Sequence, residues 1–240
     1  ADHVFANSKS LVSFVGSGVT SVGANAFENC TSLTSASFSP ELTEIASSMF
    51  KGCASLKEFV LTEKITMVGY SAFQGTGIEN FLLPSNATFD KANSGSLLRN
   101  CTSLKTAQLN SSITALGSYF FEGDKALTTV TGLSGVTSMD SNTFIGCSKL
   151  TSLDLDVSKI TAMGSSTFLN CASLRTAYIP TTAEYTQILT STFEGATSLT
   201  TVTIPENVED DAKELKQGDK VLVWYDFVAM SMPGQATATK

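Results

Sequence analysis

The stretch Phe27-Glu28-Asn29-Cys30-Thr31-Ser32-Leu33 decides the fold, because the sequence returns to it along most of its length. Two close copies are Phe50-Lys51-Gly52-Cys53-Ala54-Ser55-Leu56 and Phe168-Leu169-Asn170-Cys171-Ala172-Ser173-Leu174. We call the first residue of each copy the anchor. The nine anchors, spaced 22 to 25 residues apart, are Phe5, Phe27, Phe50, Phe73, Leu98, Phe121, Phe144, Phe168 and Phe193. A fixed period of this size predicts a solenoid, in which each repeat buries its apolar face against its neighbours.

The position two residues after the anchor is always Gly or Asn. Its occupants are Asn7, Asn29, Gly52, Gly75, Asn100, Gly123, Gly146, Asn170 and Gly195. Gly and Asn tolerate a left-handed backbone, which is unfavourable for most other residues. The pattern therefore favours a left-handed residue that ends a short helical turn, with a solvated polar loop as the alternative.

Apolar residues at fixed offsets predict the strands. From the Leu six residues after the anchor, the pattern runs L-x-x-Φ-x-Φ, where Φ is apolar, as in Leu56-x-x-Phe59-x-Leu61. The last two apolar positions have the period of a strand with one buried face. Apolar pairs eight and five residues before the anchor, such as Ile65 and Val68, would fill the opposite wall. We expect eight or nine parallel strands, at 11–15, 33–38, 56–61, 78–83, 104–109, 127–132, 150–155, 174–179 and 199–204.

The L-x-x-L-x-L strand resembles that of the leucine-rich-repeat superfamily. The complete unit, as in Val22-Gly23-Ala24-Asn25-Ala26-Phe27-Glu28-Asn29-Cys30-Thr31-Ser32-Leu33, is similar to the BspA-like (Treponema pallidum-type) leucine-rich repeats of bacterial and some protozoan surface proteins. The resemblance covers about residues 4–205. It implies an α/β fold: a right-handed leucine-rich-repeat solenoid with a parallel strand ladder on one face and short helical turns or extended segments on the other.

The repeat pattern also divides the chain. We expect a solenoid over residues 1–205, followed by a C-terminal cap and flexible tail over 206–240. A strand at 220–227 carries the single tryptophan and would supply the cap, because terminal repeats need a covering element. The rhythm breaks at 84–97, where the paired apolar signal is lost, and at 181–186. Insertions in solenoids form loops on one face, often a functional one, although sequence drift explains them equally well.

Five cysteines share one repeat position, three residues after the anchor: Cys30, Cys53, Cys101, Cys147 and Cys171. An odd number placed by periodicity is not a disulfide framework, and no C-x-x-C pair is present for zinc. We expect a ladder of buried thiols, although adjacent rungs ~4.8 Å apart leave a disulfide between Cys30 and Cys53, or between Cys147 and Cys171, open. Asp124 takes the same position, where an unpaired buried carboxylate is costly. Either that rung is looser or Asp124 accepts backbone N–H groups.

Motifs for catalysis or cofactor binding do not occur in the sequence. The one histidine is His3, so no base is available inside the fold for a Ser-His-Asp or Cys-His arrangement. Phosphate-binding, dinucleotide-binding, zinc-protease and EF-hand motifs are absent as well. The net charge of −7 argues against non-specific nucleic-acid binding. No apolar run approaches the ~20 residues of a membrane-spanning helix. We therefore expect no enzyme activity, no cofactor, no metal, no nucleic-acid partner and no membrane span.

The outward positions of the predicted strands form the broadest surface. Most are Thr or Ser, as exposed strands favour. One cluster departs from this background and combines charge with two aliphatic side chains: Lys57, Glu58, Val60, Glu79, Leu82, Lys105 and Gln108. Arg175 and Tyr178 form a smaller pair of residue types that anchor interfaces. Asp154 lies on the same face, where ordinary surface charge accounts for it. These ten residues are the candidate partner-binding face, although less regular rungs would produce the same departures.

These observations predict a non-enzymatic binding module. The resemblance to BspA-like proteins implies a secreted or cell-surface protein that adheres to host or neighbouring-cell macromolecules. A protein partner is the first expectation, a glycan is the second, and the chain is expected to be a monomer. A structural spacer that displays another domain and a carbohydrate-binding module are the alternatives. No signal sequence begins the chain, and we expect it to have been removed.

Overall fold

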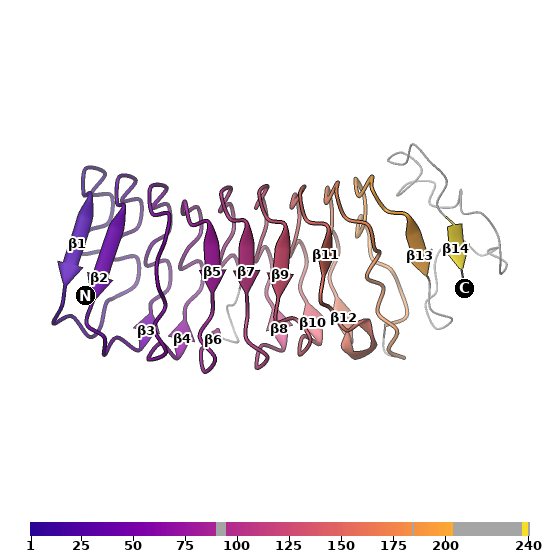
Figure 1. The fold of residues 1–240 in the computed structure, drawn as a ribbon, viewed down its shortest axis with the longest axis horizontal. Helices are drawn as coiled ribbons and strands as arrows, with labels where there is room; N and C mark the ends of the chain where they lie inside the picture. Colours follow the sequence, from indigo (N-terminus) through magenta and orange to yellow (C-terminus); the bar gives the residue numbers. More distant parts are fainter. Residues whose placement is uncertain (90–94, 184, 204–236, 240) are drawn as a thin grey trace.

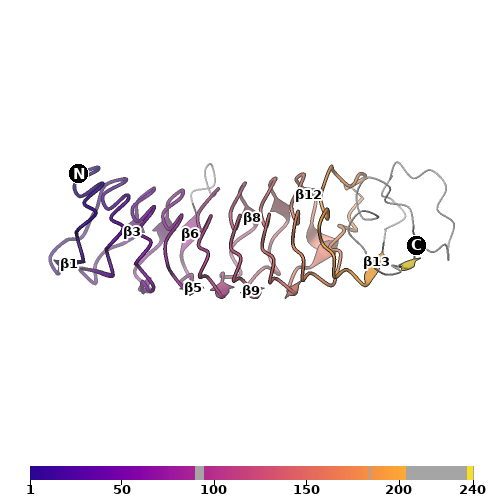
Figure 2. The same ribbon diagram turned by 90° about the horizontal axis from the view of Figure 1, so that it is seen from above.

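The computed structural model describes residues 1–89, 95–183, 185–203 and 237–239. The chain winds into an elongated solenoid whose successive repeats lie side by side along one axis (Figures 1 and 2). All strand pairs among the described residues are parallel, which confirms the predicted ladder. Residues 220–227, expected to form the cap, lie outside the described residues.

The strands of one face, which we call the strand face, follow the L-x-x-Φ-x-Φ segments, except for β14 near the end of the chain. β1 pairs with β2, and β13 pairs with β14. Between these two pairs lies a four-stranded sheet of β5, β7, β9 and β11. In this sheet the buried middle residues, such as Phe81, Ala107 and Val130, face the core between exposed neighbours. The bounds are β1 Ser13–Gly16, β2 Ser35–Phe38, β5 Asn80–Leu82, β7 Thr106–Gln108, β9 Thr129–Thr131, β11 Ser152–Leu153, β13 Thr201–Thr203 and β14 Thr237–Thr239.

The opposite wall consists of two short three-stranded sheets, β3-β4-β6 and β8-β10-β12. Each strand ends on a buried apolar residue, which in every strand except β6 belongs to the predicted pair. β6 lies within 84–97, where we expected the apolar signal to be lost, yet Phe89 is buried and continues the wall. The bounds are β3 Glu44–Ile45, β4 Met67–Val68, β6 Thr88–Phe89, β8 Ala115–Leu116, β10 Ser138–Met139 and β12 Ala162–Met163.

The predicted helical turns, and with them the α/β class, are wrong. The one helix among the described residues is the 3-10 helix η1, Val157–Lys159. The Gly or Asn after each anchor does have positive φ in all nine repeats, between 59° and 77°. A second left-handed residue lies two positions before each anchor, with φ between 53° and 66°: His3, Asn25, Ser48, Ser71, Ser96, Tyr119, Asn142, Ser166 and Ser191. Two left-handed residues in each copy leave no run of helical backbone.

The backbone N–H groups of the anchors also show why these turns are not helical. The N–H of Phe27 donates to the carbonyl of Met49 at 2.9 Å, and the N–H of Phe50 donates to that of Ala72 at 2.9 Å. These bonds join one repeat to the next, so the amides are not available for the i to i−4 bonds of a helix. The turns thus form a third inter-repeat ladder.

A column of anchor rings fills the core. The rings of Phe121 and Phe144 stack with centroids 5.1 Å apart, and those of Phe144 and Phe168 stack at 5.5 Å. Each of these three side chains is fully buried. Offset-stacked rings at such distances add to the free energy gained from burying their area. Each repeat of the sequence therefore adds one ring to a single stacked column of side chains.

The cysteines form the predicted thiol ladder. All five are free and buried. Each Sγ donates to the carbonyl of the preceding anchor, as from Cys53 to Phe27 and from Cys147 to Phe121, both at 3.1 Å. Burial raises the pKa of the Cys53 thiol to about 12. The reactive thiolate is therefore strongly disfavoured.

The expected strand at 56–61 does not form. No backbone hydrogen bond joins residues 58–61 to either neighbouring rung in the described part of the chain. Where strands of this face do pair, Phe14 faces Ala36 and Phe81 faces Ala107, but Leu153 faces Val130. By the repeat pattern, Phe59 would face Phe81 on one side and Ala36 on the other. Side-chain size alone therefore does not account for the missing pairing, which is absent on both sides.

Candidate functional site

The candidate face begins with two exposed aliphatic side chains on neighbouring rungs. Val60 is 80% exposed and Leu82 is 59% exposed. Leu82 is the last residue of β5 and lies opposite Gln108 of β7, which is also exposed. The Val60 and Leu82 side chains point away from the core, which the alternate residues of each rung fill, so they do not contribute to its packing.

Charged side chains lie beside this pair in three consecutive rungs. The N–H of Glu79 donates to the carbonyl of Lys57 at 3.0 Å, and the N–H of Lys105 donates to that of Glu79 at 2.8 Å. The Lys105 Nζ also lies 2.6 Å from Glu79 Oε2. This hydrogen bond and the lysine charge lower the pKa of the Glu79 carboxyl. An exposed pair of this kind contributes little to stability.

The structure therefore brings seven of the predicted residues together. We call them the aliphatic–charged patch: Lys57, Glu58, Val60, Glu79, Leu82, Lys105 and Gln108. Glu79 is partly covered by its ion pair and the other six are exposed. The patch spans the unpaired rung at 58–61 and the first two strands of the four-stranded sheet.

Tyr178 is not on the open face, contrary to the prediction. Its side chain is only 8% exposed, and its ring lies 6.0 Å from that of Phe168. Its Oη donates to the carbonyl of Leu153 at 3.0 Å and accepts from the N–H of Leu153 at 2.7 Å. The expected strand at 174–179 is reduced to a single bridged residue, Thr176. The phenol thus replaces the strand partner that β11 lacks at this position.

The other two predicted residues have separate environments. Asp154 is exposed, but its two carboxylate oxygens accept from the N–H groups of Gly132 and Leu133 at 2.9 and 3.1 Å. Because Gly132 has a φ of 83°, this carboxylate stabilises a left-handed turn of the preceding rung. Arg175 is exposed and lies apart from the aliphatic–charged patch. The proposed Arg175–Tyr178 pair is therefore not formed as a surface feature.

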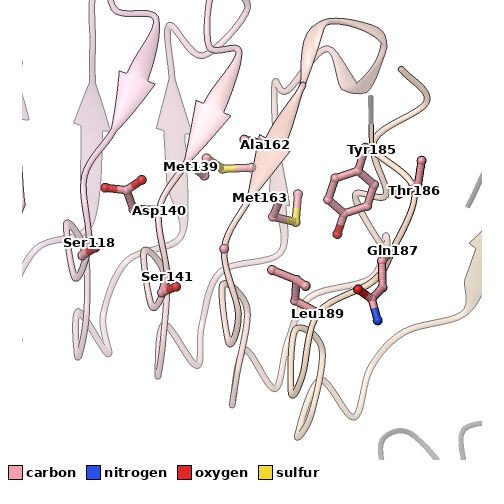
Figure 3. Close-up of a pocket in the computed structure, with 11 residues that line it drawn as sticks. Ser118, Met139, Asp140, Ser141, Ala162, Met163, Tyr185, Thr186, Gln187 and Leu189 are labelled. Carbon is pink, nitrogen blue, oxygen red and sulfur yellow. The ribbon is translucent and has the colours of Figure 1, made fainter. Parts of the chain in front are cut away.

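Sequence reasoning missed a groove on the opposite wall. It has a volume of about 460 Å³ and lies between the ends of β10 and β12 and the segment 185–189. Figure 3 shows Met139 and Met163 on neighbouring strands, with Tyr185 and Leu189 on the following segment. The lengthening of the last repeat at 181–186 was the available signal, but it did not reveal which side chains would line the groove.

The described residues offer neither a metal site nor a membrane-spanning helix. They contain no group of three or more His, Cys, Asp and Glu side chains placed to hold a metal ion. Among them, no helix has the length and hydropathy needed to cross a bilayer.

The family is settled by the repeat itself. A family model described as "BspA type Leucine rich repeat region (6 copies)" matches residues 1–95 and 91–214. The chain belongs to the BspA-type leucine-rich-repeat family. This membership confirms the resemblance deduced from the anchor and strand motifs. No curated protein matches the sequence.

Solved structures share the fold of this BspA-type chain at low identity. The T. pallidum leucine-rich-repeat protein TpLRR has 22% identity and a TM-score of 0.60, over 68% of this chain and 78% of that one. A leucine-rich cell surface protein from Faecalibacterium prausnitzii A2-165 has 22% identity and a TM-score of 0.52, over 86% and 70%. The pneumococcal vaccine antigen PcpA has 17% identity and a TM-score of 0.54, over 82% of this chain and 57% of PcpA.

Proposed function

We propose that this BspA-type chain is a non-enzymatic, secreted or cell-surface module that binds a protein of a host or neighbouring cell through its strand face. The aliphatic–charged patch is the contact. The observation that carries the proposal is the exposure of Val60 and Leu82, 80% and 59%, on neighbouring rungs of a rigid array. Interfaces with an apolar centre and a polar rim are typical of protein–protein recognition.

The arrangement of the patch supports a protein partner. Val60 and Leu82 supply the apolar centre, and Lys57, Glu79 and Lys105 supply a rim with both signs of charge. Mixed charge disfavours wrong partners and fixes the register of the correct one. The cell-surface description of the F. prausnitzii protein supports the proposed location. The chain acts as a monomer, since one copy carries the whole patch.

The test is a charge substitution in the centre of the patch. Purified extracellular-matrix proteins are immobilised, and the intact chain is compared with the double variant Val60→Glu/Leu82→Glu. A partner should lose roughly tenfold or more in affinity, about 1.4 kcal/mol, because two carboxylates would be buried at the contact. The matched control is Thr129→Glu/Thr151→Glu, which adds the same charge to exposed positions of the same face. Equal affinities for the two double variants would contradict the proposal, provided that circular dichroism shows both to be folded.

A further inference from the structure

The groove between β10, β12 and the segment 185–189 has an apolar floor. Met139 and Met163 are 1% and 3% exposed, and the Tyr185 side chain is 6% exposed. Leu189 adds an apolar edge at 36% exposure. Thioether side chains adapt their shape to a ligand more readily than branched ones do. Leu189 therefore supplies the exposed apolar surface of the groove, and the buried methionine side chains beneath it can adapt to a small molecule.

Hydrogen-bonding side chains stand around this floor. Asp140 and Gln187 are exposed, and no described side chain or backbone group bonds to their carboxylate or amide. Ser118 and Ser141 contribute hydroxyl groups on the side of Asp140, and Gln187 lies across from them (Figure 3). Together these groups offer acceptors and donors that neutral hydroxyl groups can satisfy. A small number of placed polar groups on an apolar surface is the usual composition of a ligand site.

The charges at the groove exclude several ligand classes. None of the described lining residues is Lys, Arg or His, and Asp140 is the one ionisable acid among them. A phosphate or carboxylate ligand would therefore meet a like charge without a compensating cation. A pyranose ring combines an apolar C–H face with hydroxyl groups at its edge, which matches both the floor and the rim.

We propose that this groove binds a neutral oligosaccharide, with Leu189 under a sugar ring and Asp140 and Gln187 on its hydroxyl groups. The site is separate from the aliphatic–charged patch, so the two can be tested independently. Its volume of about 460 Å³ lies within the range of small-ligand sites. The module thus has a protein-binding face and a glycan-binding wall.

The experiment uses the intact chain labelled with ¹³C at the methionine methyl groups. Maltotetraose, cellotetraose and triacetylchitotriose are titrated to millimolar concentration, with galacturonic acid trimer as the anionic probe. The expected result is a saturable shift of the Met139 and Met163 methyl signals with at least one neutral probe and no shift with the anionic one. Asp140→Ala and Gln187→Ala should each weaken that binding tenfold or more, whereas Val60→Glu/Leu82→Glu should leave it unchanged.

Three outcomes would overturn the proposal. The first is the absence of Met139 and Met163 shifts with every neutral probe. The second is binding that persists at full strength in both Asp140→Ala and Gln187→Ala. The third is equal or tighter binding of the anionic trimer, which the lining charges forbid. A chain that fails here can still bind its protein partner through the strand face, so the two proposals fail separately.

Discussion

At the scale of single residues, Asp124 is the exception to the thiol ladder. It occupies the repeat position that cysteine holds in five other repeats and is fully buried. Its Oδ1 accepts from the N–H of Cys101 at 2.8 Å, as one of the two sequence interpretations required. Its Oδ2 has no partner among the described residues. Burial raises the pKa of this carboxyl well above its ordinary value, and the nearby Glu122 adds to the rise.

This environment predicts a stability that falls as pH rises. Since the folded-state pKa of Asp124 is raised above the unfolded one, its favourable contribution is complete below the unfolded pKa and is lost as pH rises through the folded pKa. The groups facing it are the thiols of Cys101 and Cys147 and the carboxyl of Glu122. Asp124→Asn keeps the acceptor for Cys101 and removes the charge. Melting curves from roughly pH 5 to 8, above the range of ordinary carboxyls, should show the variant increasingly more stable than the parent. Parallel curves would contradict the assignment.

The anchor column supports a second prediction at this scale. Phe144→Ala removes a fully buried ring that stacks on Phe121 and Phe168. The free energy of unfolding should fall by about 3–5 kcal/mol, because the cavity has neighbours on both sides. Phe5→Ala is the matched control, since Phe5 is only partly buried and has a stacked anchor, Phe27, on one side. Denaturant titrations that give equal losses would argue against a stacked column.

At the scale of elements, the rungs of the strand face are not equivalent. Pairing is continuous through β5, β7, β9 and β11 and fails at 58–61 and 174–179. In the second case Tyr178 takes over the hydrogen bonds of a strand. The periodic pattern predicted both strands because it counts apolar residues and does not record which backbone groups find partners in the next rung.

Tyr178→Phe tests this replacement of a strand by a side chain. The variant keeps the ring but leaves the N–H and carbonyl of Leu153 without the phenol. The free energy of unfolding should fall by roughly 1–3 kcal/mol, the cost of leaving such groups unsatisfied. Arg175→Ala, at an exposed position of the same rung, should change it by less than ~0.5 kcal/mol. A Tyr178→Phe variant as stable as the control would show that the phenol bonds are dispensable.

At the scale of the whole molecule, each repeat contacts only its neighbours, so the period of the sequence was sufficient to predict the solenoid. Anchor, thiol and left-handed positions were found because they recur in register. The helical class was wrong because the second left-handed position is held by Ser, Asn, His and Tyr, which give no uniform signal. Tyr178 was misjudged for a related reason: its hydroxyl bonds to the backbone of Leu153 in the adjacent rung, and periodicity does not encode such a contact.

The central claim, that the aliphatic–charged patch receives a protein partner, is tested most directly by hydrogen exchange of the intact chain with and without a partner from the matrix panel. Residues 58–61 lack backbone hydrogen bonds within the described chain, so their amides should exchange quickly in the free protein. Binding at Val60 and Leu82 should slow exchange at 58–61 and leave the groove segment 185–189 unchanged. Slowed exchange at 185–189 with none at 58–61 would contradict the claim and move the protein contact to the opposite wall.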